Sequence, residues 1–151
     1  MAMIHIADDE ADIRQLLSFM LTEDGHEVST SGDGHSCIER MLMSPPHLLI
    51  LDLMMPEMDG YSVLQEMADY QILDHTKILV LTAKAAEQDR ERGYELGADE
   101  YVTKPCDEGE LRTVVMTMLD LGKEELKVRR EDLKDKARLF SQLESVVEQE
   151  R

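Results

Sequence analysis

This sequence has few cysteines, and it lacks long apolar runs and an N-terminal leader. Cys37 and Cys106 are its only cysteines, too few for a disulfide framework, and we expect both to be free thiols. No window approaches the length of a membrane-spanning helix, and no charged leader precedes an apolar segment. These absences exclude a disulfide-rich secreted domain and an integral membrane protein, and they predict a cytoplasmic location. The five histidines are scattered, so no cysteine and histidine cluster has the spacing of a zinc site.

A basic surface is also absent. The formal net charge is −17, and it comes entirely from residues 1 to 122, because residues 123 to 151 contain eight basic and eight acidic side chains. An acidic body repels phosphate backbones and anionic lipid headgroups. We therefore expect no direct binding to nucleic acid or to a membrane. For most of these carboxylates the simplest role is solubility.

Short apolar runs alternate with stretches of helical length. A chain of 151 residues suits one globular domain with a modest addition. Apolar runs that alternate with helices are typical of buried parallel strands, so the pattern predicts an α/β fold: a doubly wound five-stranded parallel sheet with helices on both faces. The predicted strands are 3–7, 27–31, 47–51, 77–82 and 100–103. Helices are predicted from after the first strand to about residue 25, over 34–43, about 61–70 and about 86–96, and around 111–119.

Polar residues stand at the ends of four of these runs, where a core residue would be expected. Asp8 and Asp9 follow the first strand, Asp52 follows the third, Thr82 ends the fourth, and Lys104 follows the fifth. Because the carboxyl ends of parallel strands meet at one edge of the sheet, where ligands bind, we expect these five side chains to share one small pocket.

The mixture of charges in this pocket points to phosphoryl chemistry. Two adjacent carboxylates repel each other, and although one could cap the following helix, a divalent cation explains both together with Asp52. Mg²⁺ is preferred because it binds few protein oxygens and keeps waters. Asp52 could be a metal ligand only, or a nucleophile that forms an aspartyl phosphate. A pure cation site gains nothing from an ammonium, whereas a phosphoryl group needs the charge of Lys104 and the hydroxyl of Thr82.

Four motifs carry a resemblance to a known family. They are Ala7-Asp8-Asp9-Glu10, Leu51-Asp52-Leu53-Met54-Met55-Pro56-Glu57-Met58-Asp59-Gly60, Leu81-Thr82-Ala83-Lys84 and Gly97-Ala98-Asp99-Glu100-Tyr101-Val102-Thr103-Lys104-Pro105. In order and spacing, over roughly residues 3 to 121, they resemble the receiver domain of bacterial two-component response regulators, and a set of this size is highly specific. The resemblance implies a flavodoxin-like fold with strand order 2-1-3-4-5. It also implies a phosphoacceptor regulator rather than an enzyme with a separate substrate.

The resemblance assigns roles to the acidic residues. Asp52 would accept a phosphoryl group from a sensor histidine kinase or a phosphotransfer protein, with Mg²⁺ as the cofactor. Asp9 and Asp52 would bind the ion directly, and Asp8 would act mainly through water. The backbone carbonyl of Met54 would supply a further ligand.

The remaining motif residues would serve the phosphoryl group. In the resembling family, the positions of Thr82 and Lys104 each bind one phosphoryl oxygen, and the position of Ala83 is small so that the group stays accessible. Lys84 flanks the site at a position that tunes the lifetime of the phosphorylated form. Pro105 would follow Lys104 through a cis peptide bond.

Tyr101 has two interpretations. A tyrosine on a strand usually packs against its neighbours. In the resembling family, however, this position is a switch aromatic that turns inward when the hydroxyl at the Thr82 position is drawn to the phosphoryl group. The predicted helix over residues 86–96 has little apolar surface and contains a glycine, so its stability should be low and it is a place where repacking could occur.

The tail, residues 123–151, is charged and contains neither proline nor glycine. Apolar residues recur every seven positions, in phase with the preceding helix: Leu119, Leu126, Leu133, Phe140 and Val147. This register predicts one helix that runs through Gly122. It slightly favours a homodimer through the C-terminal helix, a coiled coil, with the surface from Ala86 to Leu121 as the other candidate for dimerisation. A helix that folds back on the body, or a partly frayed signalling linker, is the alternative.

Two other functions stay open at this point. A scaffold with the receiver fold could act by dimerisation without phosphorylation, although nothing structural requires the acidic triad with Thr82 and Lys104. A hydrolase of the haloacid-dehalogenase kind would need a second aspartate two residues after its nucleophile, and that position is Met54. No output domain is visible, so the chain is either a complete single-domain regulator or part of a longer one.

Overall fold

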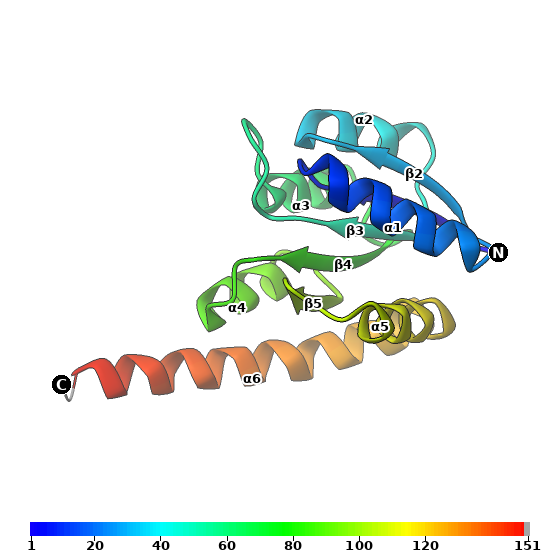
Figure 1. Cartoon of the computed structure of the whole chain (residues 1–151). Helices are drawn as coiled ribbons and strands as arrows, with labels where there is room; N and C mark the ends of the chain where they lie inside the picture. Colours follow the sequence, from blue (N-terminus) through cyan, green and yellow to red (C-terminus); the bar gives the residue numbers. More distant parts are fainter. Residues whose placement is uncertain (150–151) are drawn as a thin grey trace.

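Strand and helix alternate along the chain as the apolar runs predict (Figure 1). The computed structural model describes residues 1–149. Its elements are β1 (Met3–Ala7), α1 (Ala11–Glu23), β2 (Glu27–Ser31), α2 (Gly34–Met43), β3 (Leu48–Leu51), α3 (Gly60–Asp69), β4 (Lys77–Thr82), α4 (Glu87–Glu95), β5 (Glu100–Thr103), α5 (Glu108–Asp120) and α6 (Lys123–Gln149). The five strands are parallel and lie in the order β2-β1-β3-β4-β5. The predicted flavodoxin-like, doubly wound fold is therefore confirmed.

Successive side chains of the buried strands belong to two hydrophobic clusters, one on each face of the sheet. Leu48 and Ile50 lie in the cluster under α1 and α5, whereas Leu49 and Leu51 of the same strand lie in the cluster under α2, α3 and α4. All four side chains are buried. Because both faces are covered, the strands appear in the sequence as continuous apolar runs rather than as alternating ones.

The predicted element bounds hold to within about three residues. β3 begins at Leu48 rather than at His47, whose imidazole Nδ1 instead accepts a hydrogen bond from the backbone N–H of Met3 at 2.8 Å. α1 ends at Glu23, and Gly25 follows with a φ of 91°, a left-handed conformation that glycine adopts without strain.

α4 has weak local support, as its sequence predicts. Asp33, Asp59 and Asp107 cap α2, α3 and α5, each accepting a hydrogen bond from a backbone N–H in the first turn. α4 begins after Ala86, which has no side-chain oxygen, and Gly93 lies in its interior. The stability of α4 therefore depends on its contacts with other elements.

The prediction of one helix through Gly122 is wrong. α5 ends at Asp120, the backbone of Leu121 is extended with a ψ of 142°, and α6 begins at Lys123. After this break α6 runs back beneath β5 and α4 (Figure 1). The heptad register is the same for a straight helix and for a broken one, so it could not distinguish them.

Burial of apolar side chains explains the break. Leu126 and Ala137 on α6 are buried, and Leu133 packs against the hydrophobic cluster that contains Ala137. A straight continuation of α5 would leave all three in water. The first half of α6 therefore folds back on the body. This is the alternative that the sequence left open beside a coiled coil.

Ion pairs reinforce this docking at the start of the helix. Lys123 Nζ lies 2.9 Å from Oδ2 of Asp99, which is fully buried, and donates to the carbonyl oxygen of Thr76 at 2.9 Å. Arg129 Nη2 lies 2.8 Å from Oε2 of Glu100 on β5. The first turns of α6 are thus attached to the segment where β4 and β5 begin.

The second half of α6 extends past α4, away from the sheet (Figure 1). Its large apolar side chains are exposed, whereas in the first half Leu126 is buried and Leu133 is half-buried. Within residues 1–149, no helix is both long enough and apolar enough to cross a membrane. The last two residues of the predicted tail, 150 and 151, lie outside the described part of the chain.

Candidate functional site

Three of the predicted site residues meet at the carboxyl ends of β1, β3 and β5. Lys104 Nζ lies 2.6 Å from Oδ2 of Asp8 and 3.0 Å from Oδ2 of Asp52. Both carboxylates are nearly inaccessible to solvent, at 3% and 4% exposure. A single ammonium therefore bridges two buried carboxylates that are distant in the sequence.

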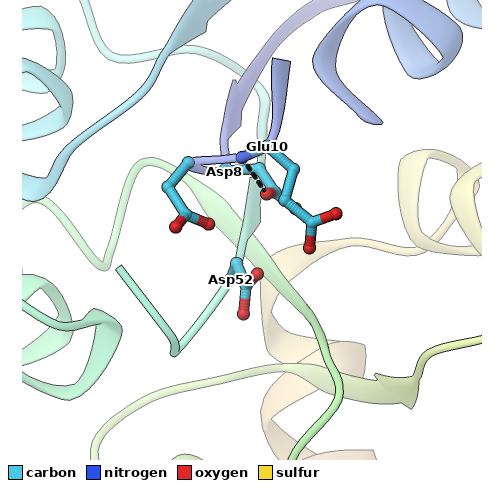
Figure 2. A group of neighbouring side chains, drawn as sticks. Asp8, Glu10 and Asp52 are labelled. Atoms are coloured by element: carbon cyan, nitrogen blue, oxygen red, sulfur yellow. Dashed lines mark hydrogen bonds between the residues drawn. The ribbon is translucent and has the colours of Figure 1, made fainter. Parts of the chain in front are cut away.

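The carboxylates at this edge outnumber the ammonium. Asp8, Asp9, Glu10 and Asp52 each offer one oxygen, and these oxygens all lie within 4.8 Å of one another. Figure 2 shows Asp8 and Glu10, from the segment after β1, beside Asp52 at the end of β3. Lys104 neutralises only part of this charge. The donor set fits a hard divalent cation such as Mg²⁺, because all the ligands are oxygens and the exposed pair, Asp9 and Glu10, leaves room for water.

The two buried carboxylates are held by their own loops. Oδ1 of Asp8 accepts a hydrogen bond from the backbone N–H of Glu10 at 2.9 Å, and Oδ1 of Asp52 accepts one from that of Met54 at 2.9 Å. Gly60 lets the loop after Asp52 close, because a Cβ at this position would lie only 2.6 Å from the carbonyl oxygen of Asp52. Each carboxylate thus keeps its other oxygen for Lys104. The metal-binding role of the Met54 carbonyl stays a prediction.

Burial and ion pairing oppose each other in this pocket. Burial raises the pKa of Asp8, and the hydrogen bond from Lys104 offsets part of that rise. Burial alone would lower the pKa of Lys104, but its hydrogen bonds to Asp8 and Asp52 outweigh burial and raise this pKa overall. Lys104 therefore stays charged, and it supplies a fixed positive charge beside Asp52.

The ends of β4 and β5 complete the pocket. Thr82 is fully buried, its carbonyl oxygen accepts a hydrogen bond from the backbone N–H of Lys104 at 2.8 Å, and its hydroxyl accepts a long one from that of Lys84 at 3.4 Å. Ala83 is exposed, and the bond between Lys104 and Pro105 is cis, as predicted. A largely apolar cavity of about 430 Å³ opens beside Ala83 and Lys104, between α1 and α5.

Tyr101 lies inward, between the loop after β4 and α4. Its ring is buried, and its hydroxyl donates a hydrogen bond to the carbonyl oxygen of Lys84 at 2.7 Å. The Arg90 guanidinium lies 5.0 Å from the ring centroid. Gly93 leaves space for the ring, since a Cβ there would approach it to 3.2 Å. Tyr101 therefore packs, and it also connects the segment after Thr82 with α4.

Two groups in this region were not among the predicted site residues. Glu10 is only the last residue of the first motif, yet its carboxylate joins the acidic group and lies 3.9 Å from Lys104 Nζ. Tyr61, on the first turn of α3, donates a hydrogen bond to Asp89 on α4 at 2.7 Å, and the Arg92 guanidinium lies 3.9 Å from its ring centroid. A tyrosine after a glycine predicts nothing more specific than packing.

Comparison with known proteins gives consistent results. Residues 4–116 match the family model of the response regulator receiver domain. Over 116 residues the chain is 40% identical to "Probable transcriptional regulator ycf27" of Cyanophora paradoxa, covering 77% of this chain and 47% of the relative. It is 37% identical, over the same share of this chain and 48% of the relative, to the alkaline phosphatase synthesis transcriptional regulatory protein PhoP of Bacillus subtilis (strain 168). The chain thus spans about half the length of the curated relatives it matches.

A solved structure is similar over nearly all of its own length. The response regulator protein TrrA from Thermotoga maritima, crystallised in complex with Mg²⁺-BeF, superposes with a TM-score of 0.69 at 32% sequence identity. The match covers 78% of this chain and 99% of the solved one.

Proposed function

Because the chain belongs to the response regulator receiver domain family, we propose that it takes a phosphoryl group onto Asp52 from a phosphohistidine of a sensor histidine kinase or phosphotransfer protein. The observation that carries the proposal is the contact of Lys104 with both Asp8 and Asp52 inside the acidic group. The family consists of signalling regulators rather than classical enzymes, so the chemistry is limited to gain and loss of this one group.

Asp52 is the acceptor in this reaction. One of its carboxylate oxygens attacks phosphorus, the bond between phosphorus and the donor imidazole nitrogen breaks, and that nitrogen keeps the electron pair and takes up a proton. Lys104 is already within hydrogen-bond distance of Asp52, so its ammonium can move from the carboxylate to an oxygen of the transferred group. The hydroxyl of Thr82, at the end of the neighbouring strand, would bind another oxygen.

Asp8, Asp9 and Asp52 would hold Mg²⁺, with the Met54 carbonyl as a further ligand and Glu10 adding negative charge. When bound, the ion would neutralise charge on the phosphoryl oxygens. Asp9 and Glu10 are the exposed members of the acidic group, so the ion and the donor would reach the buried Asp52 from their side.

The switch would pass from Thr82 to α4 and then to the tail. Movement of Thr82 towards the phosphoryl group would disturb its contact with Lys84, whose carbonyl oxygen holds the Tyr101 hydroxyl. Tyr101 packs against α4, and α6 packs against α4 in turn. Low local stability of α4 makes it the element that can repack at small cost in free energy.

In this proposal residues 1–122 are the receiver and residues 123–151 are an appended signalling helix. The module would work in the cytoplasm and control a partner or an output through the α4 and α6 surface. The names of the relatives suggest control of transcription as one such output.

The test is phosphorylation by a small phosphodonor in the presence of Mg²⁺, read by intact mass. The wild-type chain should gain one phosphoryl group, and Asp52→Asn should gain none. Asp33→Asn is the matched control, because Asp33 is a half-buried helix cap on α2 outside the acidic group, and it should behave like the wild type. An Asp52→Asn protein that gains the same mass would refute the assignment. A folded wild type that binds Mg²⁺ but is never phosphorylated, either by the small donor or by a kinase, would favour the scaffold.

A further inference from the structure

The second half of α6 carries a row of exposed apolar side chains. Their exposed fractions lie between 45% and 63%: Leu139, Phe140, Leu143, Val146 and Val147. We call these five residues the distal stripe. A contiguous row of this kind on a highly charged chain is typical of an interaction surface.

The distal stripe does not lie on the face of α6 that contacts the body. At 3.6 residues per turn, its centre is rotated by roughly a quarter turn from the row of Leu126, Leu133 and Ala137. On the side of the distal stripe, the first half of the helix presents Val128 and Asp132, and both are exposed. A partner can therefore bind the distal stripe while the first half of α6 stays docked on α4.

We propose that the distal stripe joins two copies of this chain into an antiparallel homodimer, with Leu143 packed near Val146 of the partner subunit. The charge distribution of the chain favours this occupant. All of the net charge of −17 lies in residues 1–122, and the tail is neutral as a whole. An antiparallel pair places the two acidic bodies at opposite ends of the shared helices, so their repulsion is small.

Two kinds of charge repulsion would disfavour a parallel pair. It would place both acidic bodies at the same end of the dimer. It would also continue the seam into Asp132 and Lys136, where each residue would face its own copy, and like charges that face each other on a helical seam are destabilising.

The surface also fits a second copy better than a lipid bilayer. An acidic body is repelled by anionic headgroups, and the second half of α6 has glutamates, not a lysine-rich polar face, beside its apolar row.

Five half-exposed side chains amount to a few hundred Å² on each copy, so the dimer falls in the class of interfaces below about 1,200 Å² and should dissociate on dilution. The inference does not depend on phosphorylation.

Sedimentation equilibrium of the full unphosphorylated chain tests the interface. We expect a monomer and dimer equilibrium that Leu143→Glu weakens by about tenfold or more, because a carboxylate would be buried at the centre of the contact. Val128→Glu is the matched control, since Val128 is an apolar residue on α6 that is 69% exposed and lies outside the distal stripe, and it should leave the equilibrium unchanged. Circular dichroism of each variant verifies that α6 remains helical.

Cysteine cross-linking tests the orientation in a Cys106→Ser background, in which Cys37 is buried. A mixture of Leu143→Cys and Val146→Cys chains should form a mixed disulfide, whereas Leu139→Cys alone should not cross-link to itself. Efficient cross-linking of Leu139→Cys to itself would indicate a parallel pair and overturn the proposal. A chain that stays monomeric at all concentrations, a dimer unaffected by Leu143→Glu, or a monomer that cosediments with vesicles would also overturn it.

Discussion

Lys104 sets the electrostatics of the acidic pocket at the scale of single residues. Its ammonium is the positive charge that bridges Asp8 and Asp52, and both carboxylates would otherwise be buried beside each other without compensation. A bound cation would also compensate the charge of these two carboxylates. A bound Mg²⁺ would therefore compete with Lys104 for one set of oxygens, and a phosphoryl group on Asp52 would separate the two.

This competition predicts the effect of Lys104→Met. Removing a positive charge that lies 3.0 Å from Asp52 should raise the affinity for Mg²⁺, by about tenfold at the effective dielectric constants of partly exposed sites. The same variant should be phosphorylated more slowly, because an oxygen of the incoming group loses its partner. Calorimetric titration with Mg²⁺ measures the first effect. Lys84→Met serves as the control, and unchanged Mg²⁺ affinity in Lys104→Met would argue against the competition.

His5 makes the stability of the fold depend on pH. Its ring nitrogens lie 2.7 Å from the Ser29 hydroxyl and 2.9 Å from that of Ser31, and burial, assisted by Arg40, lowers its pKa from 6.5 to about 4. The unfolded chain therefore binds a proton between pH 6.5 and pH 4 that the folded chain does not. Stability is fully present above pH 6.5 and declines as the pH falls towards 4, by about 3 kcal/mol in all.

Urea unfolding of the wild type and of His5→Asn between pH 7 and pH 5 checks this expectation. The wild type should lose stability more steeply over this range than His5→Asn does. His75→Asn, at an exposed position, should keep the wild-type slope. Equal slopes in the wild type and in His5→Asn would contradict the assignment.

Asp8, Asp52 and Lys104 were predictable because parallel strands place their carboxyl ends at one edge, so position in the sequence fixes position in space. Glu10 and Tyr61 were not, because their roles depend on side-chain rotamers and on how α3 meets α4. Periodicity carries no information about either. The sequence thus predicts the residues attached directly to strand ends and misses those whose roles depend on a rotamer or on a contact between helices.

At the scale of elements, α4 is the helix that depends most on contacts with its neighbours. Tyr61 on α3, Tyr101 on β5 and the first half of α6 all contact it, whereas its own cap is missing. Any change in these contacts changes the free energy of α4 directly. Low helix propensity over residues 86–96 was visible in the sequence, but the docking of α6 was not, because the heptad register suits both a coiled coil and a buried face.

The start of α6 provides a test of this docking. Lys123→Met removes a partner of the buried Asp99, so we expect the free energy of unfolding to fall by about 2 kcal/mol, since an uncompensated buried charge is costly. The loss is limited because Asp99 keeps its hydrogen bond from the N–H of Ile78. Lys127→Met is the control, as Lys127 pairs with exposed carboxylates alone, Asp74 at 3.8 Å and Glu124 at 3.5 Å.

Urea denaturation of both variants measures the difference. Limited proteolysis adds a second readout, because cleavage within α6 should become faster in Lys123→Met than in Lys127→Met. Equal stability of the two variants would mean that the Lys123 contact does not hold the helix.

The whole molecule is an acidic body with a neutral arm. The body carries all of the net charge of −17, and self-repulsion of this size destabilises a compact state. Both the fold class and this division of charge follow from the sequence, because they depend on composition and on the order of apolar runs. The direction of the arm does not, since it is decided by the backbone at the single residue Leu121.

Salt should therefore stabilise the chain. Raising NaCl from about 0.01 M to about 0.5 M shortens the screening length several-fold, and we expect a gain of about 1 kcal/mol, or roughly 2–4 °C in the melting temperature. Choline chloride at the same ionic strength should give the same rise, whereas MgCl₂ should give a larger one through the acidic group. A melting temperature that is independent of NaCl would show that repulsion is already relieved.

The course of α6 has a consequence for access to the pocket. The helix starts beside Asp99, where β5 begins, and Arg138 Nε lies 3.5 Å from Oε1 of Glu91 in the middle of α4. The helix thus travels in the same direction as the strands, and its far end passes beyond the edge where β3 ends (Figure 1). In the proposed function, a partner bound at that far end and the phosphodonor of Asp52 would approach from one side of the protein. Steric exclusion between these two molecules would then couple their binding, even if the backbone between the two sites never moved.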